Sequence, residues 1–333
     1  MALIIQKFGG TSLGETASRE LLAGKVRKAR EAGDRVVLVV SAMGRRGDPY
    51  ATDTLLDLLK EFPGGADGLT SDLMVSCGEV ISACVIAALL NSRGIGAVPM
   101  TAHTAGIGAE GPFGDAAPAS IDATRVRKVL DEGKVPVVAG FQGVDASGRL
   151  LTLGRGGSDT SAVALGAALG ADFVDIYKDV PGVAKADPRL VKGVPFMKFL
   201  DYDSMFRLAN HGSRVLHDKS ALLAKRSGLR MRVRSTFDEG EGTLIGPEGA
   251  GEAVPPFLGL ATTPESGDRM RMTAVFASGA GKSPKGLAAA REAAAKLGGG
   301  LVGQPCDDPD AAVFVCAREK AAALAAGLFE ALD

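Results

Sequence analysis

Two glycine-rich segments of the sequence carry charged side chains that could bind an anionic ligand. In the first, Lys7, Gly9 and Gly10 come directly after a short apolar run at residues 3–6. Glycines let the main chain approach an anion closely, and the N–H groups at the start of a following helix point toward that anion. Taken alone, however, a lysine beside two glycines is more typical of a surface turn.

The second segment, residues 152–160, makes a ligand site the better interpretation. It contains three glycines, Arg155 and Asp159, and an alanine-rich stretch follows it. A helix N-cap would explain one of the residues Ser158, Asp159 and Thr160. It would not explain Arg155, whose glycine neighbours leave a guanidinium exposed for bidentate binding of a carboxylate. Together the two segments predict a site that binds a phosphate and a carboxylate.

The elements that must position these segments alternate between strand and helix. Apolar runs typical of buried parallel strands occupy residues 3–6, 36–40, 97–99, 135–139, 173–176 and 230–234. Helical stretches occupy residues 16–32, 71–93, 121–132, 160–169 and 202–226. This alternation predicts an α/β fold with a doubly wound, mostly parallel sheet. Ligands of such sheets bind beyond the carboxyl ends of the strands, which is where both glycine-rich segments fall.

The pattern changes after residue 246, where a polar stretch rich in glycine and proline at residues 247–256 predicts a linker. Beyond it we expect strands at residues 257–262, 270–277, 300–305 and 311–317 and helices at residues 284–297 and 318–331. Their order is that of a small ferredoxin-like α+β module with one strand moved to the front. We therefore expect two domains, at residues 1–246 and 257–333.

Composition excludes several other classes of protein. Among 333 residues, 46% are hydrophobic and 23% charged, which is typical of a globular chain. The 38 Lys and Arg against 39 Asp and Glu leave a net charge of −1, so no bulk field attracts nucleic acid or an anionic membrane. The four cysteines are too scattered for a disulfide framework or a Cys-x-x-Cys metal site. The apolar run at residues 83–90 is too short to cross a bilayer, so we expect a cytoplasmic protein.

In several longer segments the sequence resembles the aspartokinases of the amino acid kinase superfamily. The matching segments are residues 6–12, 40–55, 76–82, 139–143, 152–162, 175–189, 211–217 and 233–245. The resemblance implies an amino acid kinase fold followed by a single, permuted ACT-like module. It also implies the reaction ATP + L-aspartate → ADP + 4-phospho-L-aspartate, the entry to lysine, threonine and methionine synthesis. Mg²⁺ would accompany ATP, bound mostly through phosphate oxygens and water, and the protein would be a homodimer or higher homo-oligomer.

The resemblance also assigns roles to individual residues. Lys7 would bridge the transferring phosphoryl group and the attacking carboxylate, and Asp159 would orient Lys7 rather than act as a base, because that carboxylate is ionised at pH 7. Arg155 would bind the α-carboxylate of aspartate, and Glu79 its ammonium group. The other expected substrate contacts are Thr52, Phe141, Gly156, Gly157 and Ser158. The other expected ATP contacts are Phe8, Gly9, Gly10, Ser41, Lys178, Asp179, Ala184, Lys185, Arg189 and Arg214.

Three of these positions depart from the usual aspartokinase pattern. Lys178 stands where threonine is usual, Ala184 where tyrosine is common, and Arg214 where lysine is usual. An arginine keeps the charge of lysine but replaces a point cation with a planar fork. The departures bear on nucleotide affinity more than on the phosphoryl transfer itself.

Several alternatives stay open at the level of the sequence. Ser76 and Glu79 have the spacing of a capping box, and Thr52 could be the N-cap of a helix at residues 53–59. The C-terminal module could bind an amino acid or only mediate assembly. The whole protein could be another amino acid kinase, such as an acylglutamate kinase, or a catalytically silent paralogue that binds an amino acid and regulates a partner.

Overall fold

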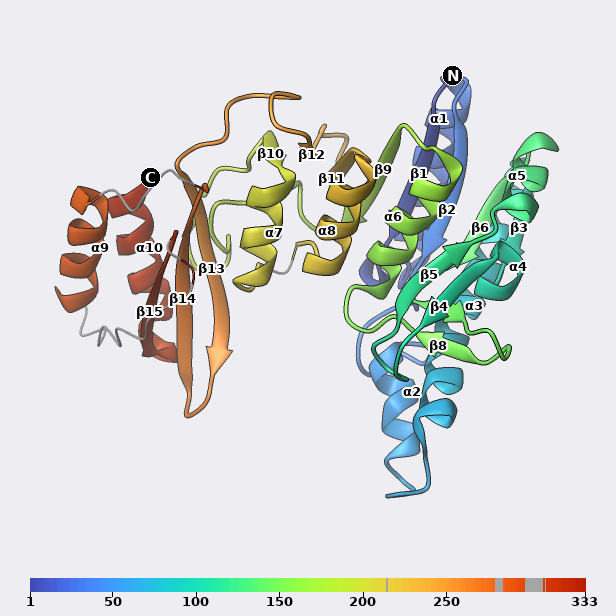
Figure 1. Cartoon of the computed structure of the whole chain (residues 1–333), viewed down its shortest axis with the longest axis horizontal. Helices are drawn as coiled ribbons and strands as arrows, with labels where there is room; N and C mark the ends of the chain where they lie inside the picture. Colours follow the sequence, from blue (N-terminus) through green and yellow to red (C-terminus); the bar gives the residue numbers. More distant parts are fainter. Residues whose placement is uncertain (214, 279–283, 297–307, 309) are drawn as a thin grey trace. The chain divides into compact units, whose positions relative to one another are not determined.

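The computed structural model describes residues 1–213, 215–278, 284–296, 308 and 310–333 (Figure 1). The chain divides into two compact units, the first made of Met1–Pro181 and Leu222–Glu241, the second of Gly182–Ala221 and Gly242–Asp333. These units differ from the expected domains at residues 1–246 and 257–333. The difference arises because the segment Gly182–Ala221 belongs with the C-terminal part of the chain.

The first unit is built on a parallel sheet with the strand order β11-β9-β1-β2-β6-β3. The strands are β1 (Leu3–Phe8), β2 (Arg35–Val40), β3 (Ala97–Met100), β6 (Val135–Ala139), β9 (Phe173–Lys178) and β11 (Met231–Ser235). All six apolar runs predicted as strands are confirmed, with ends that differ by at most two residues. Strands β2 and β6 are almost entirely buried, as expected for a sheet covered on both faces.

Helices cover both faces of this sheet, which confirms the doubly wound α/β fold (Figure 1). On one face, α1 (Thr16–Glu31) and α3 (Gly68–Ser92) share a buried core with Leu38 and Val40 of β2. On the other face, α6 (Gly157–Leu169) packs so closely that a Cβ on Gly166 would lie 3.2 Å from Ile5 of β1. Helix α5 (Thr124–Asp131) lies against β6 and β2.

A second, smaller sheet in the first unit was not predicted from the sequence. It has the order β5-β4-β7-β8, with β4 (Ile107–Glu110), β5 (Ala117–Ile121), β7 (Gln142–Val144) and β8 (Leu150–Thr152). Buried Asp72 of α3 ties this sheet to the core, because it accepts hydrogen bonds from the Thr152 main-chain N–H at 2.7 Å and hydroxyl at 2.9 Å. The short elements α2 (Thr52–Leu59), α4 (Ala102–Ala105) and the 3₁₀ turn Gly10–Ser12 complete the unit.

Helix α3 is, within the described part of the chain, long and apolar enough to span a membrane by length and composition. Half of its most apolar window is buried inside the structure. The helix also carries the buried carboxyl groups of Asp72 and Glu79, and both accept hydrogen bonds from neighbouring segments of the unit. These contacts identify α3 as a core helix of the sheet.

In the second unit, an antiparallel sheet of β13 (Phe257–Glu265), β14 (Arg269–Phe276) and β15 (Ala311–Ala317) packs against α9 (Pro284–Lys296) and α10 (Ala321–Leu332). A 3₁₀ turn, Arg318–Lys320, precedes α10. This confirms a small α+β region, although the strand expected at residues 300–305 lies outside the described residues. The unit also contains the parallel pair β10 (Phe199–Asp201) and β12 (Thr243–Gly246).

The single helix expected at residues 202–226 is wrong. The structure has α7 (Tyr202–Asn210), an interruption, and α8 (Asp218–Ser227). Gly212 lies in the interruption with φ = +106°, a conformation that favours glycine and that no α-helix contains. The apolar spacing continues on both sides of the break, and for this reason the sequence pattern predicted a single helix.

Candidate functional site

The structure brings Lys7 and Asp159 together as a buried ion pair. Lys7 is near the carboxyl end of β1, and Asp159 is in the first turn of α6. The Lys7 Nζ lies 2.7 Å from Asp159 Oδ1, and the two side chains are only 6% and 4% exposed. Two residues far apart in sequence therefore meet at the edge of the sheet where parallel α/β folds bind ligands.

A second lysine binds the other oxygen of the same carboxylate. Lys178, the last residue of β9, has its Nζ 3.0 Å from Asp159 Oδ2. Burial alone would raise the pKa of Asp159, but the positive charges of Lys178 and Lys7 outweigh it and hold this pKa at about 2. Burial lowers the pKa of Lys7; the attraction of Asp159 opposes this, and the repulsion of Lys178 adds to it.

Glu79 of α3 supplies a buried carboxyl group with one free oxygen. Its Oε1 accepts a hydrogen bond from the Ala42 main-chain N–H at 2.9 Å. Its Oε2 has no hydrogen-bond partner among the residues that the structure describes. Burial raises the pKa of Glu79 to about 8, against the smaller opposing effect of the hydrogen bond from Ala42. Such a group can bind a cation, because a cationic partner would stabilise its charged form.

The capping-box alternative for Glu79 is wrong. Helix α3 begins at Gly68, two turns before Ser76, and the N-cap is Asp67, whose side chain accepts a hydrogen bond from the Thr70 N–H. Ser76 is inside the helix. The N-cap alternative for Thr52 is wrong as well, because Thr52 is the first residue within α2 and the N-cap is Ala51.

Glycines are required where the loops of the site pass close to one another. A Cβ on Gly10 would lie 2.7 Å from the carbonyl oxygens of Ala42 and Gly44. A Cβ on Gly157 would lie 2.7 Å from the ring of Phe141, so this glycine lets the start of α6 approach the end of β6. Gly9 is less confined, and the nearest atom to a Cβ there would be Lys7 Nζ at 3.7 Å.

Phe141 has a strained backbone at the same edge of the sheet. Its φ is +69°, which is uncommon for a residue with a side chain and costs on the order of 1–3 kcal/mol. Two hydrogen bonds hold it there, because its N–H donates to Ser161 Oγ at 3.0 Å and its carbonyl accepts from the Leu153 N–H at 2.9 Å. Ser158 lies near the preceding residue, since a Cβ on Gly140 would be 2.9 Å from Ser158 Cβ. Strain maintained by such contacts is typical of a functional site.

Arg155 lies exposed immediately before α6. It is flanked by Gly154 and Gly156, which have φ of +70° and +68°, and Gly156 is the N-cap of the helix. No ion pair or hydrogen bond engages the Arg155 guanidinium within the described ranges of the chain. Its donors are therefore available to a ligand.

One expected ATP contact, Phe8, has its ring in the hydrophobic core. The ring is fully buried and stacks on Tyr177, with centroids 4.5 Å apart. Side chains alternate along a strand, so Lys7 and Phe8 face opposite sides of the sheet. Only the main chain of Phe8 could contact a nucleotide, and its carbonyl already accepts a hydrogen bond from the Ser41 N–H at 3.1 Å.

The remaining expected ATP contacts belong to both units. In the first unit, Asp179 is paired with Arg45, with Oδ2 3.1 Å from the guanidinium. In the second unit, Ala184 forms a β-bridge with Phe196, Lys185 pairs with Asp333, and Arg189 pairs with Asp187. Arg214 lies outside the described residues.

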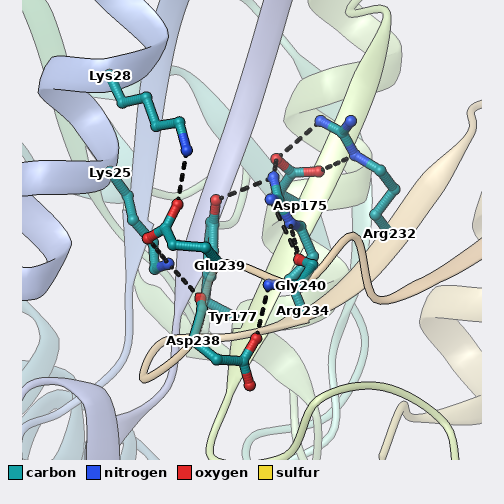
Figure 2. Close-up of polar contacts among 9 residues, drawn as sticks. All are labelled: Lys25, Lys28, Asp175, Tyr177, Arg232, Arg234, Asp238, Glu239 and Gly240. Atoms are coloured by element: carbon teal, nitrogen blue, oxygen red, sulfur yellow. Dashed lines mark hydrogen bonds and ion pairs between the residues drawn. The ribbon is translucent and has the colours of Figure 1, made fainter. Parts of the chain in front are cut away.

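A polar network that sequence reasoning missed fixes the chain beside the site (Figure 2). Asp175 of β9 is buried and binds the Arg232 guanidinium through both oxygens, at 2.6 and 2.9 Å. Arg234 lies 3.4 Å from the same carboxylate. Figure 2 shows the loop after β11 held on its other side by Lys25, which donates to the Asp238 carbonyl at 2.8 Å. A charged residue within an apolar strand was the signal that could have identified Asp175.

This network stabilises the end of β9, where Lys178 lies. The loop after β11 begins with Thr236, whose N–H donates to the Lys178 carbonyl at 2.8 Å. The Thr236 hydroxyl lies 2.7 Å from the Ser12 hydroxyl, in the loop after β1. Lys25 and Lys28 of α1 both bind the Glu239 carboxylate farther along, at 3.0 and 2.8 Å. The loop that hydrogen-bonds to the main chain of Lys178 is thus held by contacts with the loop after β1 and with α1.

Comparisons with known proteins show which family the chain resembles. Residues 2–235 match the amino acid kinase family. The aspartokinase of Bacillus sp. (strain MGA3) is 44% identical over 248 residues, which cover 74% of this chain and 59% of that protein. The chain thus spans about three-fifths of the length of the curated relatives it matches.

Two solved structures are similar over almost the whole chain. The aspartate kinase from Synechocystis is 30% identical with a TM-score of 0.65, and the match covers 99% of this chain and 56% of that one. Aspartokinase III of E. coli in complex with aspartate and ADP has a TM-score of 0.80 and covers 99% of both chains. At 20% identity, the second likeness concerns the fold alone.

Proposed function

The chain belongs to the amino acid kinase family, and from this premise we propose that it transfers the γ-phosphoryl group of ATP to the side-chain carboxylate of L-aspartate. The observation that carries the proposal is the buried ion pair of Lys7 and Asp159, together with the carboxyl group of Glu79. This group interacts electrostatically with Lys7, and one of its oxygens has no hydrogen-bond partner among the described residues. The identity of 44% to the Bacillus aspartokinase supports the choice of substrate.

Phosphoryl transfer requires an attacking oxygen held in line and charge neutralised on the transferring group. The attacking aspartate oxygen forms a bond to the γ-phosphorus while the bond to the bridging oxygen breaks, and ADP leaves with the electron pair. No base is needed, because the attacking carboxylate is already ionised at neutral pH. A carboxylate with a pKa of about 2 is a poor base, so Asp159 serves to orient the Lys7 ammonium toward the two anions that approach each other.

Charge complementarity accounts for the choice of an amino acid as acceptor. Glu79 would bind the ammonium group of aspartate through its free oxygen, and exposed Arg155 would bind the α-carboxylate. Thr52, Phe141 and Ser158 would line the same pocket. A simple carboxylic acid offers neither partner and would bind poorly.

The nucleotide and its metal ion are part of the same proposal. Within the described residues no group of three or more His, Cys, Asp or Glu side chains could hold a metal ion. Mg²⁺ would accompany ATP, held chiefly by phosphate oxygens and water, and it would neutralise charge on the phosphates. A cytoplasmic location and assembly into a homodimer or larger homo-oligomer complete the proposal.

The proposal is tested by measuring ADP release from ATP and Mg²⁺ with and without L-aspartate, and by trapping the acyl phosphate with hydroxylamine. We expect ADP and hydroxamate to form together and only with L-aspartate. Turnover of N-acetylglutamate instead would identify an acylglutamate kinase. Aspartate binding without ADP release would identify a silent regulatory paralogue. Either outcome would overturn the proposal.

The pKa of Glu79 predicts how aspartate binding depends on pH. The ammonium group binds the ionised carboxylate, and the pKa of Glu79 in the free protein is about 8. Below that pH, aspartate must displace a proton, so its KM should fall roughly tenfold for each unit of rising pH and then level off. Steady-state kinetics between pH 6 and 9 measure this.

The matched control is Glu79→Gln. It should bind aspartate weakly at every pH, and its KM for aspartate should not fall as the pH rises. The KM for ATP should lack the same pH dependence in the parent protein. A KM for aspartate that does not change between pH 6 and 8 would contradict the role given to Glu79.

Arg155→Lys is expected to weaken saturation by aspartate while it spares ATP. Lysine keeps the charge but loses the planar fork that binds both oxygens of a carboxylate. We expect the KM for aspartate to rise by about tenfold or more, in line with the loss of one charge-assisted hydrogen bond. A variant whose KM for ATP alone rises would show that the two halves of the site are assigned the wrong way round.

A further inference from the structure

We propose that Lys178 is a positioning residue of the transfer site, which binds the Asp159 oxygen that Lys7 leaves free and so fixes the direction of the Lys7 ammonium. The inference deepens the proposed function, since its kinetic consequence rests on that function. Its structural consequence can be measured in the free protein. Direct contact with ATP, the role that sequence resemblance gives to Lys178, is not needed for this effect.

The register of the sheet explains why both lysines reach one carboxylate. In the pairing of β1 with β9, Lys7 lies beside Ile176. Lys178 is two residues beyond Ile176, so it projects from the same face of the sheet as Lys7. That face is covered by α6, whose first turn carries Asp159. One strand step in either direction would place the Lys178 side chain on the opposite face.

The contacts are divided between the two oxygens of the carboxylate. Lys7 Nζ lies 2.7 Å from Oδ1, and Lys178 Nζ lies 3.0 Å from Oδ2. Lys178 is less buried than Lys7, at 21% against 6% exposed, but its main chain is anchored by the hydrogen bond from Thr236. An ammonium group has three N–H donors. Lys7 contacts Oδ1 as an ion pair and so keeps donors for a ligand.

Removal of the Lys178 charge would free the second oxygen. A buried carboxylate oxygen without a partner is unfavourable, and Asp159 could relieve it by turning both oxygens toward Lys7. The Lys7 donors would then point at Asp159 rather than at the transferring phosphoryl group. The local charge would also change, because two cations around one anion leave a surplus positive charge that suits a phosphate.

The test compares Lys178→Met, which keeps the stem and removes the charge, with Lys178→Arg, which keeps the charge. Lys134→Met, which breaks the exposed pair of Lys134 with Glu132, is the matched control. The titration of Lys7 is followed by NMR in the free protein labelled with ¹³C at the lysine ε-carbon. The Lys7 signal is assigned by its loss in Lys7→Arg. The charged groups that act on Lys7 are Asp159, Lys178 and Glu79.

We expect the titration midpoint of Lys7 to rise in Lys178→Met, because a neighbouring like charge is lost, and to stay near the parent value in Lys178→Arg and in the control. We expect kcat/KM at pH 7 to fall by about 10- to 100-fold in Lys178→Met, the scale of misplacing one electrostatic donor, and to recover largely in Lys178→Arg. When kcat/KM is measured as a function of pH, its decrease at alkaline pH should occur at higher pH in Lys178→Met than in the parent protein.

An unchanged Lys7 titration in folded Lys178→Met would overturn the inference, even if activity fell. A fall in activity by the same factor at every pH would also overturn it, since that is the result of a merely structural role. If Lys178→Met does not fold, Lys178→Thr, which also removes the charge, is compared with the parent protein and Lys178→Arg instead. The parent protein could show no aspartate-dependent activity while the Lys7 titration still shifts in Lys178→Met. That result would reject the proposed function and leave the positioning role intact.

Discussion

Replacement of Lys7 by alanine is expected to lower kcat by at least about 100-fold, the scale of removing one preorganised donor from a transition state. Lys7 is the buried cation at the carboxyl end of β1, and Asp159 holds its ammonium at 2.7 Å. Without Lys7, the site loses the ammonium group that would lie between the attacking carboxylate and the phosphoryl group as charge develops there. Single-turnover measurement of ADP and hydroxamate formation reports the chemical step directly.

Lys134→Ala is the control for this variant, because Lys134 is exposed and pairs only with Glu132 among the residues described. We expect parental activity from it. Circular dichroism checks whether Lys7→Ala is folded. Near-parental turnover in folded Lys7→Ala would contradict the central role of this residue.

Asp159→Asn is expected to impair both activity and stability. The substitution keeps the shape of the side chain and removes the anion between Lys7 and Lys178, so two buried or half-buried ammonium groups repel each other. Loss of one partner from a buried ion pair typically costs about 3–5 kcal/mol of unfolding free energy. Urea unfolding at pH 7 measures this cost, and we expect kcat to fall by about 100-fold or more because Lys7 is no longer oriented.

The unfolding free energy lost in Asp159→Asn should decrease at low pH. The pKa of Asp159 is lowered to about 2 in the folded protein, so the stabilisation is fully present above the unfolded value near 3.8 and disappears as the pH falls toward 2. The stability difference between the parent and Asp159→Asn should shrink over this range. Asp131→Asn, which breaks an exposed pair with Arg35, should cost less than about 1 kcal/mol at any pH. Equal costs for the two variants would contradict the buried-pair interpretation.

The site was predictable from the sequence where it depends on the ends of strands. Lys7 follows an apolar run, and Asp159 begins a helix, so any parallel α/β sheet with this order brings them to one edge. Arg155 was predicted from its glycine neighbours, and the family resemblance added Glu79. Among the described residues, Arg155 keeps unpaired donors and Glu79 keeps one oxygen without a hydrogen-bond partner. The roles of all four in catalysis and binding stay predictions until the kinetics are measured.

Other features depended on contacts that no local pattern encodes. The break between α7 and α8 follows from the left-handed backbone of Gly212, although the apolar spacing continues past it. The small sheet of β4, β5, β7 and β8 was missed because its strands are short and partly exposed. The Phe8 ring stacks on Tyr177 of the neighbouring strand, a contact that the sequence did not predict, so only the main chain of Phe8 could face a nucleotide.

By itself, the sequence determined the doubly wound sheet and the two glycine-rich loops at its carboxyl edge, because these follow from periodicity and local residue types. Its motifs also resembled those of the family to which the chain belongs. Only the tertiary structure decided that Lys178 faces Asp159 and that Gly182–Ala221 belongs to the second unit. The physical reason is that strand register and long-range packing select which side chains meet. Both depend on residues far apart in the chain, whose interaction energies a local pattern does not contain.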